Sequence, residues 1–212
     1  MNNQASRREH EVQFDRAKLR TVILYICSKC EPSQLGAVKL HKALYFADML
    51  VYAYVGAPIT GATYRKRAFG PTCDQLLAVL RELSKEGDLE IREVEYFGFR
   101  RKEYVSLAKP ETEWLSPAEL SVLDEVIEFV CRNNMAKAIS DFSHNRAWEL
   151  AEFGNVLPYH SVFHLFPTQV SPEALDWASG EVGQIEDKRS RNAALGGTSY
   201  GDFRNRVLET RK

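Results

Sequence analysis

The segment that most restricts the fold is residues 37–55, AVKLHKALYFADMLVYAYV, a stretch of helical length that is apolar on nearly every side. Its charged or histidine positions are Lys39, His41, Lys42 and Asp48. A helix that is hydrophobic all round is normally buried by its neighbours, so we expect it to form the centre of the core. Gly56 suits the position that follows a helix, and Pro58 prevents the helix from continuing past Val55.

The elements around this helix predict a winged-helix-like unit. Helical spacing predicts a helix over 14–29, and residues 59–69 favour an extended strand. Gly70-Pro71 is expected to turn that strand into a helix over 71–85, because proline suits the first helical position. Alternating residues then predict a β-hairpin over 89–107 with its turn near Gly98. DNA readers and protein-binding modules share such folds, so the fold alone does not decide the function.

The second half of the chain is predicted to be helical. Ser116, Pro117 and Glu119 form a helix-start signature for residues 117–133. Shorter helices are expected over 136–142 and 146–153, and another from Ser171. The predicted class is therefore mainly α with a small β-hairpin or sheet (α+β), a winged-helix-like helical core plus C-terminal helices. The expected division is a flexible leader (1–13), a domain with a winged-helix-like part (14–108) and a helical part (109–167), and a partly helical or disordered extension (168–212).

Composition favours a protein of the cytoplasm. The longest apolar run, 49–55, is far shorter than the roughly 20 residues that span a bilayer, and no apolar signal segment precedes the first helix. We therefore expect no membrane association, and reduced cysteines at positions 27, 30, 73 and 131.

Charge is distributed unevenly along the chain. Residues 1–110 carry 18 Lys/Arg and 13 Asp/Glu, residues 111–187 carry 3 and 14, and residues 188–212 carry 7 and 2. The acidic part is either a surface that steers a partner or an ordinary solvated face.

The metal-like and cofactor-like motifs are incomplete. Cys27 and Cys30 have CxxC spacing but lack a second pair, and His160 and His164 lie between prolines without the glutamate of a zinc-protease motif. The chain also lacks the glycine-rich phosphate-binding patterns and the nucleophile elbow. We therefore predict no metal, no cofactor and no enzymatic activity, and interpret these cysteines and histidines as structural.

Two polar clusters remain as candidates. Asp141, Ser143, His144 and Trp148 lie at the end of one short predicted helix and the start of the next, where they cap and anchor the fold or face a partner. Arg65, Lys66 and Arg67 combine charge with nearby aromatics, as do Arg100, Arg101 and Lys102 at the hairpin turn. They suit contacts to phosphate or to an acidic protein surface. The sequence pI of about 6.5 makes DNA the less favoured of these partners.

The order of these motifs resembles the Panacea domain, the SocA-like antitoxin domain, over roughly residues 18–165. The residues that carry the resemblance are Lys39, Leu40, Lys42, Leu44, Tyr45, Phe46, Ala47, Gly56, Pro58, Phe69, Gly70, Pro71, Leu115, Ser116, Ser140, Asp141, Ser143, His144, Ala147, Trp148, Pro158 and Tyr159. His41 departs from the pattern by standing where glutamine is commoner, and Arg67 by standing where an aromatic residue is often found.

The resemblance implies a small, mostly helical antitoxin that neutralises a cognate toxin by direct binding in a bacterial or phage toxin–antitoxin system. It also implies that the toxin is the partner, with a homodimer or a hetero-tetramer left open. The expected contacts are Arg65, Lys66, Arg67, Asp141, His144 and, in a tail that wraps the toxin, Tyr200 and Phe203. The alternatives are a DNA-binding regulator, a protease adaptor that delivers a toxin, and an enzyme using His144 with Asp141.

Overall fold

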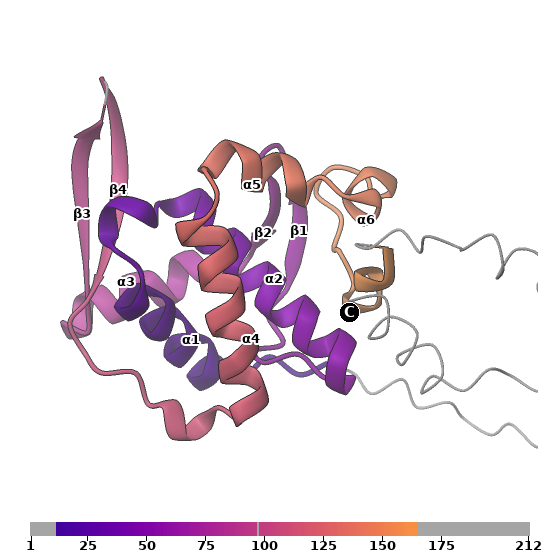
Figure 1. Ribbon diagram of the computed structural model, residues 1–212, viewed down its shortest axis with the longest axis horizontal. Coiled ribbons are helices and arrows are strands. Elements are labelled where there is room, and N and C mark those ends of the chain that lie inside the picture. The colour runs from indigo at the N-terminus through magenta and orange to yellow at the C-terminus, as the bar shows by residue number, and fades with distance from the viewer. Residues whose placement is uncertain (1–11, 97, 165–212) are drawn as a thin grey trace, which may run out of the picture. The chain divides into compact units, whose positions relative to one another are not determined.

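The computed structural model describes residues 12–96 and 98–164. The predictions for the leader up to residue 11, for the helix from Ser171, and for Tyr200 and Phe203 in the tail lie outside the described residues. Within the described part, helices predominate and two small two-stranded antiparallel sheets accompany them (Figure 1). The predicted class, mainly α with a small β component, is confirmed.

Two helices build the first layer of the core. Helix α1 (Arg16–Lys29) begins where the Asp15 side chain accepts a hydrogen bond from the Lys18 backbone N–H. The 3₁₀ turn η1 (Pro32–Gln34) separates α1 from α2 (Ala37–Val55), which ends at Gly56 in the left-handed conformation. Helix α2 packs against α1, α4, α5 and β2, so the apolar helix is the centre of the core as predicted.

The segment after α2 differs from its prediction. Residues 64–67 form β1 (Tyr64–Arg67), but Pro71 lies in a second strand, β2 (Gly70–Cys73), and helix α3 (Leu76–Glu86) begins five residues later than expected. Pro71 has no backbone N–H to donate. It is tolerated in β2 because Lys66, the residue paired with it in β1, makes its backbone hydrogen bonds elsewhere. The backbone N–H of Lys66 donates to Asn155 (3.0 Å), and its carbonyl accepts from the Gly154 N–H (3.0 Å).

The predicted β-hairpin is confirmed. Strands β3 (Leu89–Tyr96) and β4 (Phe99–Ser106) pair in register from Leu89 with Ser106 to Tyr96 with Phe99. Its base packs on α1 and α3, whereas its outer half projects beyond the helices (Figure 1). The hairpin therefore presents its tip to solvent on a base that the core holds.

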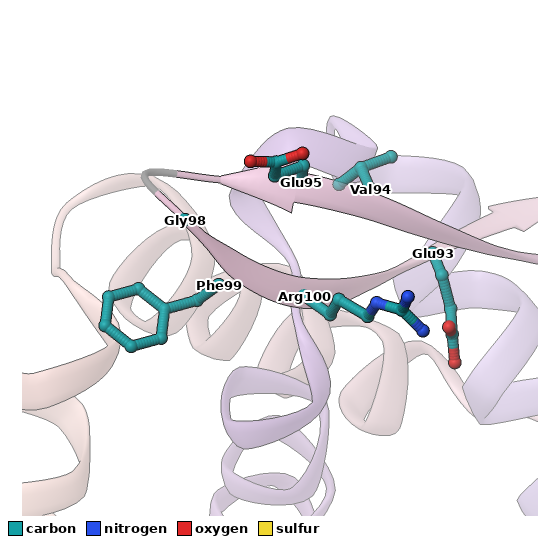
Figure 2. Close-up of a pocket in the computed structure, with 6 residues that line it drawn as sticks. All are labelled: Glu93, Val94, Glu95, Gly98, Phe99 and Arg100. Atoms are coloured by element: carbon teal, nitrogen blue, oxygen red, sulfur yellow. The ribbon is translucent and has the colours of Figure 1, made fainter.

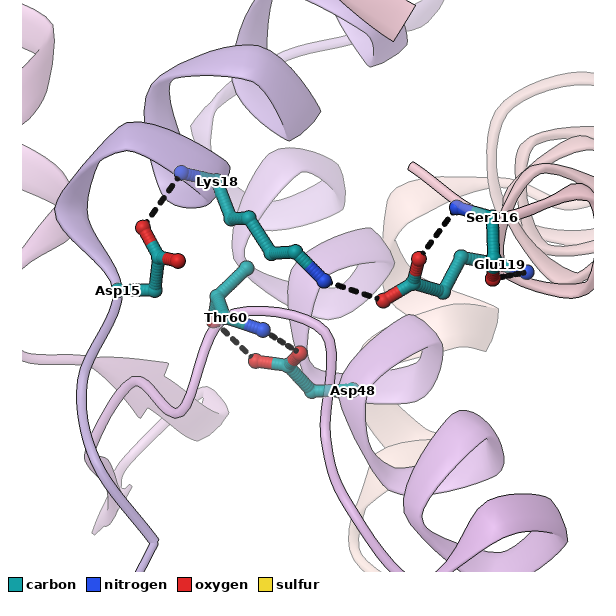
Figure 3. Close-up of polar contacts among 6 residues, drawn as sticks. All are labelled: Asp15, Lys18, Asp48, Thr60, Ser116 and Glu119. Atoms are coloured by element: carbon teal, nitrogen blue, oxygen red, sulfur yellow. Dashed lines mark hydrogen bonds and ion pairs between the residues drawn. The ribbon is translucent and has the colours of Figure 1, made fainter. Parts of the chain in front are cut away.

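The remaining helices cover the other side of α2. Turn η2 (Thr112–Trp114) leads into α4 (Pro117–Ile127), whose first turn carries a complete capping box between Ser116 and Glu119. Glu119 also accepts a hydrogen bond from Lys18 Nζ (2.8 Å), which ties α4 to α1 (Figure 3). The last turn of the predicted helix is a π-helical turn, η3 (Glu128–Arg132).

Three short helices complete the described chain. Helix α5 (Ala136–Ser143) agrees with its predicted position. Helix α6 (Arg146–Leu150) ends earlier than expected. The residues that follow run beside β1, where Val156 forms an isolated antiparallel β-bridge with Arg65. A 3₁₀ segment, η4 (Tyr159–His164), then packs against α2.

Candidate functional site

Several of the resemblance residues meet where the β1–β2 turn reaches α5. Gly70 has φ +89°, and a β-carbon there would collide with Ser143 Oγ and lie 2.9 Å from Lys42 Nζ. The Ser143 hydroxyl donates to the Ser140 carbonyl (2.7 Å), and the Ser140 hydroxyl donates to the Phe69 carbonyl (3.2 Å). Glycine is therefore required at position 70 both by its backbone conformation and by this close approach.

Lys42 lies at this junction without a carboxylate partner. Its side chain is buried, and its ammonium donates to the Pro71 carbonyl (2.8 Å). No ion pair joins Lys42 to an acid within residues 12–96 and 98–164. Burial lowers the pKa of this amine from 10.5 to about 7. Lys42 thus holds β2 through the Pro71 carbonyl, while its burial disfavours the charged form of the amine.

His144 and Trp148 form a stacked pair beside the junction. Their ring centroids lie 3.9 Å apart with the planes 14° from parallel, and the Lys66 ammonium lies 4.0 Å from the Trp148 ring. The indole N–H donates to the Arg67 carbonyl (3.3 Å), and Lys66 Nζ also donates to the Ala151 carbonyl (2.9 Å). The structure thus brings together Lys66 and His144, which were predicted separately from segments about 80 residues apart.

His144 and Asp141 are not arranged as an acid–base pair. The Asp141 carboxylate pairs with the exposed Lys137 (2.7 Å), and His144 Nε2 is buried with no hydrogen-bond partner in the described part of the chain. Burial and then the positive charge of Lys42 lower the pKa of His144. Because Asp141 pairs with Lys137 and not with His144, this geometry gives no support to the hypothesis of an enzyme that uses His144 with Asp141.

The other two basic candidates are also held by the fold. Arg65 Nε pairs with Asp74 (2.6 Å), and its guanidinium donates to the Gly154 carbonyl (3.0 Å). The Arg67 guanidinium lies 5.9 Å from the ring centroid of Phe153. Arg65 and Arg67 therefore both have partners within the fold.

A buried carboxylate that sequence reasoning left without a role organises the opposite end of α2. Asp48 accepts hydrogen bonds from the Thr60 N–H (2.8 Å) and the Thr60 hydroxyl (2.5 Å) (Figure 3). It also accepts from the hydroxyls of Tyr64 (2.8 Å) and Tyr159 (3.2 Å). Burial raises the pKa of Asp48, and these donors act in the opposite direction. The sequence signal for this cluster was an acidic residue in a mostly apolar helix, because a buried carboxylate needs hydrogen-bond donors around it.

An exposed apolar surface lies on the outside of the Gly70 junction. It consists of Phe69, Phe129, Met135 and Phe142, whose exposed fractions are 72%, 39%, 77% and 53%. The rings of Phe129 and Phe142 are 5.2 Å apart, and both pack on Phe46 of α2. We call these four residues the α5 patch. The sequence did not predict this patch, although the large apolar side chains of Phe129 in η3 and Phe142 in α5 were a visible signal.

The tip of the β3–β4 hairpin carries a second exposed feature. Glu93, Val94, Glu95, Gly98, Phe99 and Arg100 line an open hollow of about 400 Å³. Figure 2 shows the Arg100 side chain directed toward the Glu93 side of the hollow, while the Phe99 ring points away from both. The predicted basic turn is therefore mixed in charge, since carboxylates of β3 stand opposite the cations of β4. Such a surface suits a protein better than a phosphate backbone.

No group of three or more His, Cys, Asp or Glu side chains in residues 12–96 and 98–164 is arranged to hold a metal ion. Among the same residues, no helix combines the length and apolar character needed to cross a membrane.

Comparison with known proteins gives one match. A family model described as "Antitoxin SocA-like, Panacea domain" matches residues 40–149. No curated protein and no solved structure matches the chain. The matched range contains the Gly70 junction, the His144–Trp148 pair and the α5 patch, and it spans just over half of the 212 residues. This chain therefore belongs to the family of antitoxin SocA-like Panacea domains.

Proposed function

We propose that this protein is an antitoxin that neutralises a cognate toxin of a toxin–antitoxin system by direct protein–protein binding in the cytoplasm, without enzymatic activity of its own. The observation that carries the proposal is its membership of a family described as antitoxin-like. The family description names neither the toxin nor the surface that binds it.

The α5 patch is the surface best suited to a protein partner. Clustered aromatic and methionine side chains are enriched at protein interfaces, where their burial supplies most of the binding energy. The patch rests on a frame held by Lys42, Gly70 and Ser143, which fixes the backbone that carries Phe69 and Phe142. A pre-ordered apolar surface loses little conformational entropy when it docks.

Charged residues beside the patch fit the same role. Arg67, Lys137 and Asp141 are exposed near the α5 patch, and both ends of the Lys137–Asp141 pair are open to solvent. Exposed ion pairs contribute little to stability, so a partner can exchange them for its own charges at small cost. Asp141 therefore stays a proposed contact, whereas Lys66 and His144 are proposed to act by positioning the surface.

Co-expression tests the proposal directly. The product of the reading frame next to this gene is expressed from an inducible promoter in a host that lacks both genes. We expect growth to stop, and to recover when this protein is produced from a second plasmid. A neighbouring product that does not inhibit growth, or growth arrest that this protein fails to relieve, contradicts the proposal.

Surface variants then locate the contact. Met135→Ser combined with Phe142→Ser is expected to weaken binding to the neighbouring product by at least about tenfold, since each lost apolar anchor costs more than about 1 kcal/mol. Leu77→Ser is the matched control, because Leu77 is an exposed apolar residue on α3. Equal affinities of the two variants by calorimetry would remove the α5 patch from the interface.

The tail is tested separately, because Tyr200 and Phe203 are proposed anchors that fold onto the toxin. Deletion of residues 188–212 is expected to weaken toxin binding while the circular dichroism of the remaining chain keeps its helical signal. Unchanged affinity of the deletion variant would refute a contact by the tail.

A further inference from the structure

Strand β3 has a free edge over its outer half. The Leu107 backbone N–H donates to the Asp88 carbonyl (2.8 Å) just below the hairpin, so these two residues form a hydrogen-bonded pair. Bonded and non-bonded pairs alternate along an antiparallel ladder, and Glu93 and Glu95 lie an odd number of positions from Asp88. Their backbone N–H and carbonyl groups therefore point away from β4, and they have no hydrogen-bond partner in the described part of the chain.

The opposite edge of the hairpin is covered by the fold. Strand β4 packs against α1, α2 and η1. A β-carbon on Gly36, which joins η1 to α2, would lie 3.9 Å from the outward carbonyl of Lys102. Figure 1 shows β4 on the side of α1 and β3 on the outer side of the hairpin. A further strand can therefore reach the hairpin more readily at β3 than at β4.

One face of the free edge is acidic. Glu93 and Glu95 lie on the same face, and both are exposed, with no ion pair to another side chain among residues 12–96 and 98–164. Lys102 and Arg100 stand opposite them on β4. Opposite charges on neighbouring strands attract. A strand that joins β3 should therefore place cations beside the two carboxylates, so that the acids have cations on both sides.

The other face of this part of the hairpin carries apolar side chains. Val94 is half-exposed, and Phe99 is 77% exposed. Residues of both faces line the open hollow of about 400 Å³ at the tip, which leaves space for further side chains (Figure 2). Because side chains of a strand alternate between faces, a strand with cations on the acidic face presents the residues between them on the side of Val94. Apolar residues suit those positions.

The charges also disfavour other occupants of this edge. Two copies of this chain that joined through their β3 edges would bring Glu93 and Glu95 of one copy beside those of the other, and like charges on adjacent strands are destabilising. The phosphates of a nucleic acid would meet the same carboxylates. Charge complementarity therefore favours a basic segment of another protein.

We propose that the free edge of β3 binds an extended protein segment, with basic residues at alternate positions and apolar residues between them, which joins the hairpin as a third strand. Main-chain hydrogen bonds to Glu93 and Glu95 hold the segment, and the two carboxylates set its register. The inference goes beyond the proposed function, because it concerns β3 and not the α5 patch.

The experiment uses the purified full chain and a labelled synthetic peptide. In the probe, lysine and valine alternate over about seven residues, the length of an ordinary strand; a control peptide has the same residues in two blocks. We expect the alternating peptide to bind in fluorescence anisotropy, and the block peptide to bind at least about tenfold more weakly. At saturation, hydrogen exchange of the Glu93 and Glu95 amides, followed by NMR, should slow by at least about tenfold.

Three results of this experiment would each overturn the inference. They are no binding of the alternating peptide, equal binding of the two peptides, and binding that leaves the Glu93 and Glu95 amides unprotected. Because no toxin is used, these results are independent of the growth assay that tests the proposed function.

Charge-reversal variants test the acidic edge. Glu93→Lys combined with Glu95→Lys is expected to weaken binding of the alternating peptide at least about tenfold, since attraction to both carboxylates becomes repulsion. Glu113→Lys combined with Glu125→Lys is the matched control, because these exposed acids of η2 and α4 give the same change in net charge. Equal losses in the two variants would show a general charge effect and contradict the proposal.

Sedimentation of the free chain tests the competing occupant. We expect no self-association that depends on the β3 edge. A dimer that dissociates in the variant with Glu93→Lys and Glu95→Lys would assign this edge to a second copy and overturn the inference. The amide exchange of the wild-type chain decides the question even if a variant fails to fold.

Discussion

The buried amine of Lys42 gives the stability of this protein a specific dependence on pH. In the unfolded chain the amine has its ordinary pKa of 10.5, and burial lowers this to about 7 in the folded chain. The folded state therefore binds the proton less well than the unfolded state. Above the unfolded pKa there is no penalty; as the pH falls the penalty grows, and it is complete below the folded pKa.

The two pKa values set the size of the effect. A shift of this size corresponds to about 5 kcal/mol between the fully protonated and the fully neutral amine, since each unit is worth about 1.4 kcal/mol. At about pH 7 most of that penalty is present, and at about pH 9 less than half of it remains. Raising the pH over this range should therefore increase the free energy of unfolding by about 2 kcal/mol through Lys42 alone.

Urea denaturation of the wild type and of Lys42→Met isolates this contribution. Methionine fills a similar volume without a charge, so the variant lacks the pH-dependent term. We expect the wild type to gain about 2 kcal/mol more than the variant between about pH 7 and about pH 9, a difference of about 1 M in the urea midpoint. Comparing the changes cancels the titration of the cysteines and the constant loss of the bond to the Pro71 carbonyl.

The exposed Lys85 provides the control, and Lys85→Met should follow the wild type. The reasoning is refuted if Lys42→Met and the wild type respond equally to pH. Such a result would mean that water reaches the ammonium, or that a nearby group takes up its charge.

Three further predictions concern the stability of the fold and can be measured by chemical denaturation. Gly70→Ala should cost more than about 2 kcal/mol, whereas Gly87→Ala, at a similar positive φ but with open space around it, should cost about 1 kcal/mol; equal losses would exclude the collision with Ser143. Tyr159→Phe removes hydrogen bonds to Asp48 and to the Ala62 carbonyl and should cost about 1–2 kcal/mol; a neutral substitution would show that the hydroxyl is solvated instead. Ser116→Ala should cost about 1 kcal/mol through the capping box, and no loss would mean that Glu119 alone starts α4.

The elements that the sequence predicted correctly are those specified by local patterns. Helix α2 was recognisable because its apolar residues cover every face, and the β3–β4 hairpin because its residues alternate around Gly98. The capping box at Ser116 was recognisable for the same reason: its two partners are three residues apart.

Strand β2 was missed because its cause is not local. Gly70-Pro71 fits a helix start as well as a strand, and nothing nearby distinguishes the two. The deciding contacts are the two hydrogen bonds that join the Lys66 backbone to Gly154 and Asn155. They satisfy the N–H and the carbonyl of Lys66, which therefore needs no backbone hydrogen bond with Pro71. A long-range contact of this kind leaves no periodic trace in the sequence.

The sequence predicted which residues belong to the candidate site, but it did not predict the contacts that they make. Lys66 and His144 were both selected as possible partner contacts, and the structure shows that each is already engaged with Trp148. Charge and aromatic character can be read from the sequence, but whether a side chain is free or satisfied depends on what the fold places beside it.

The residues of the Gly70 junction support the proposed binding surface from beneath it. Lys42, Gly70 and Ser143 lie beneath the surface, so they cannot choose a partner by contact. They do set the positions of Phe69, which precedes Gly70, and of α5, which ends at Ser143. Changes in the junction should therefore reduce stability and binding together. Changes at Met135 should reduce binding alone, because its side chain is 77% exposed and contributes little to the core.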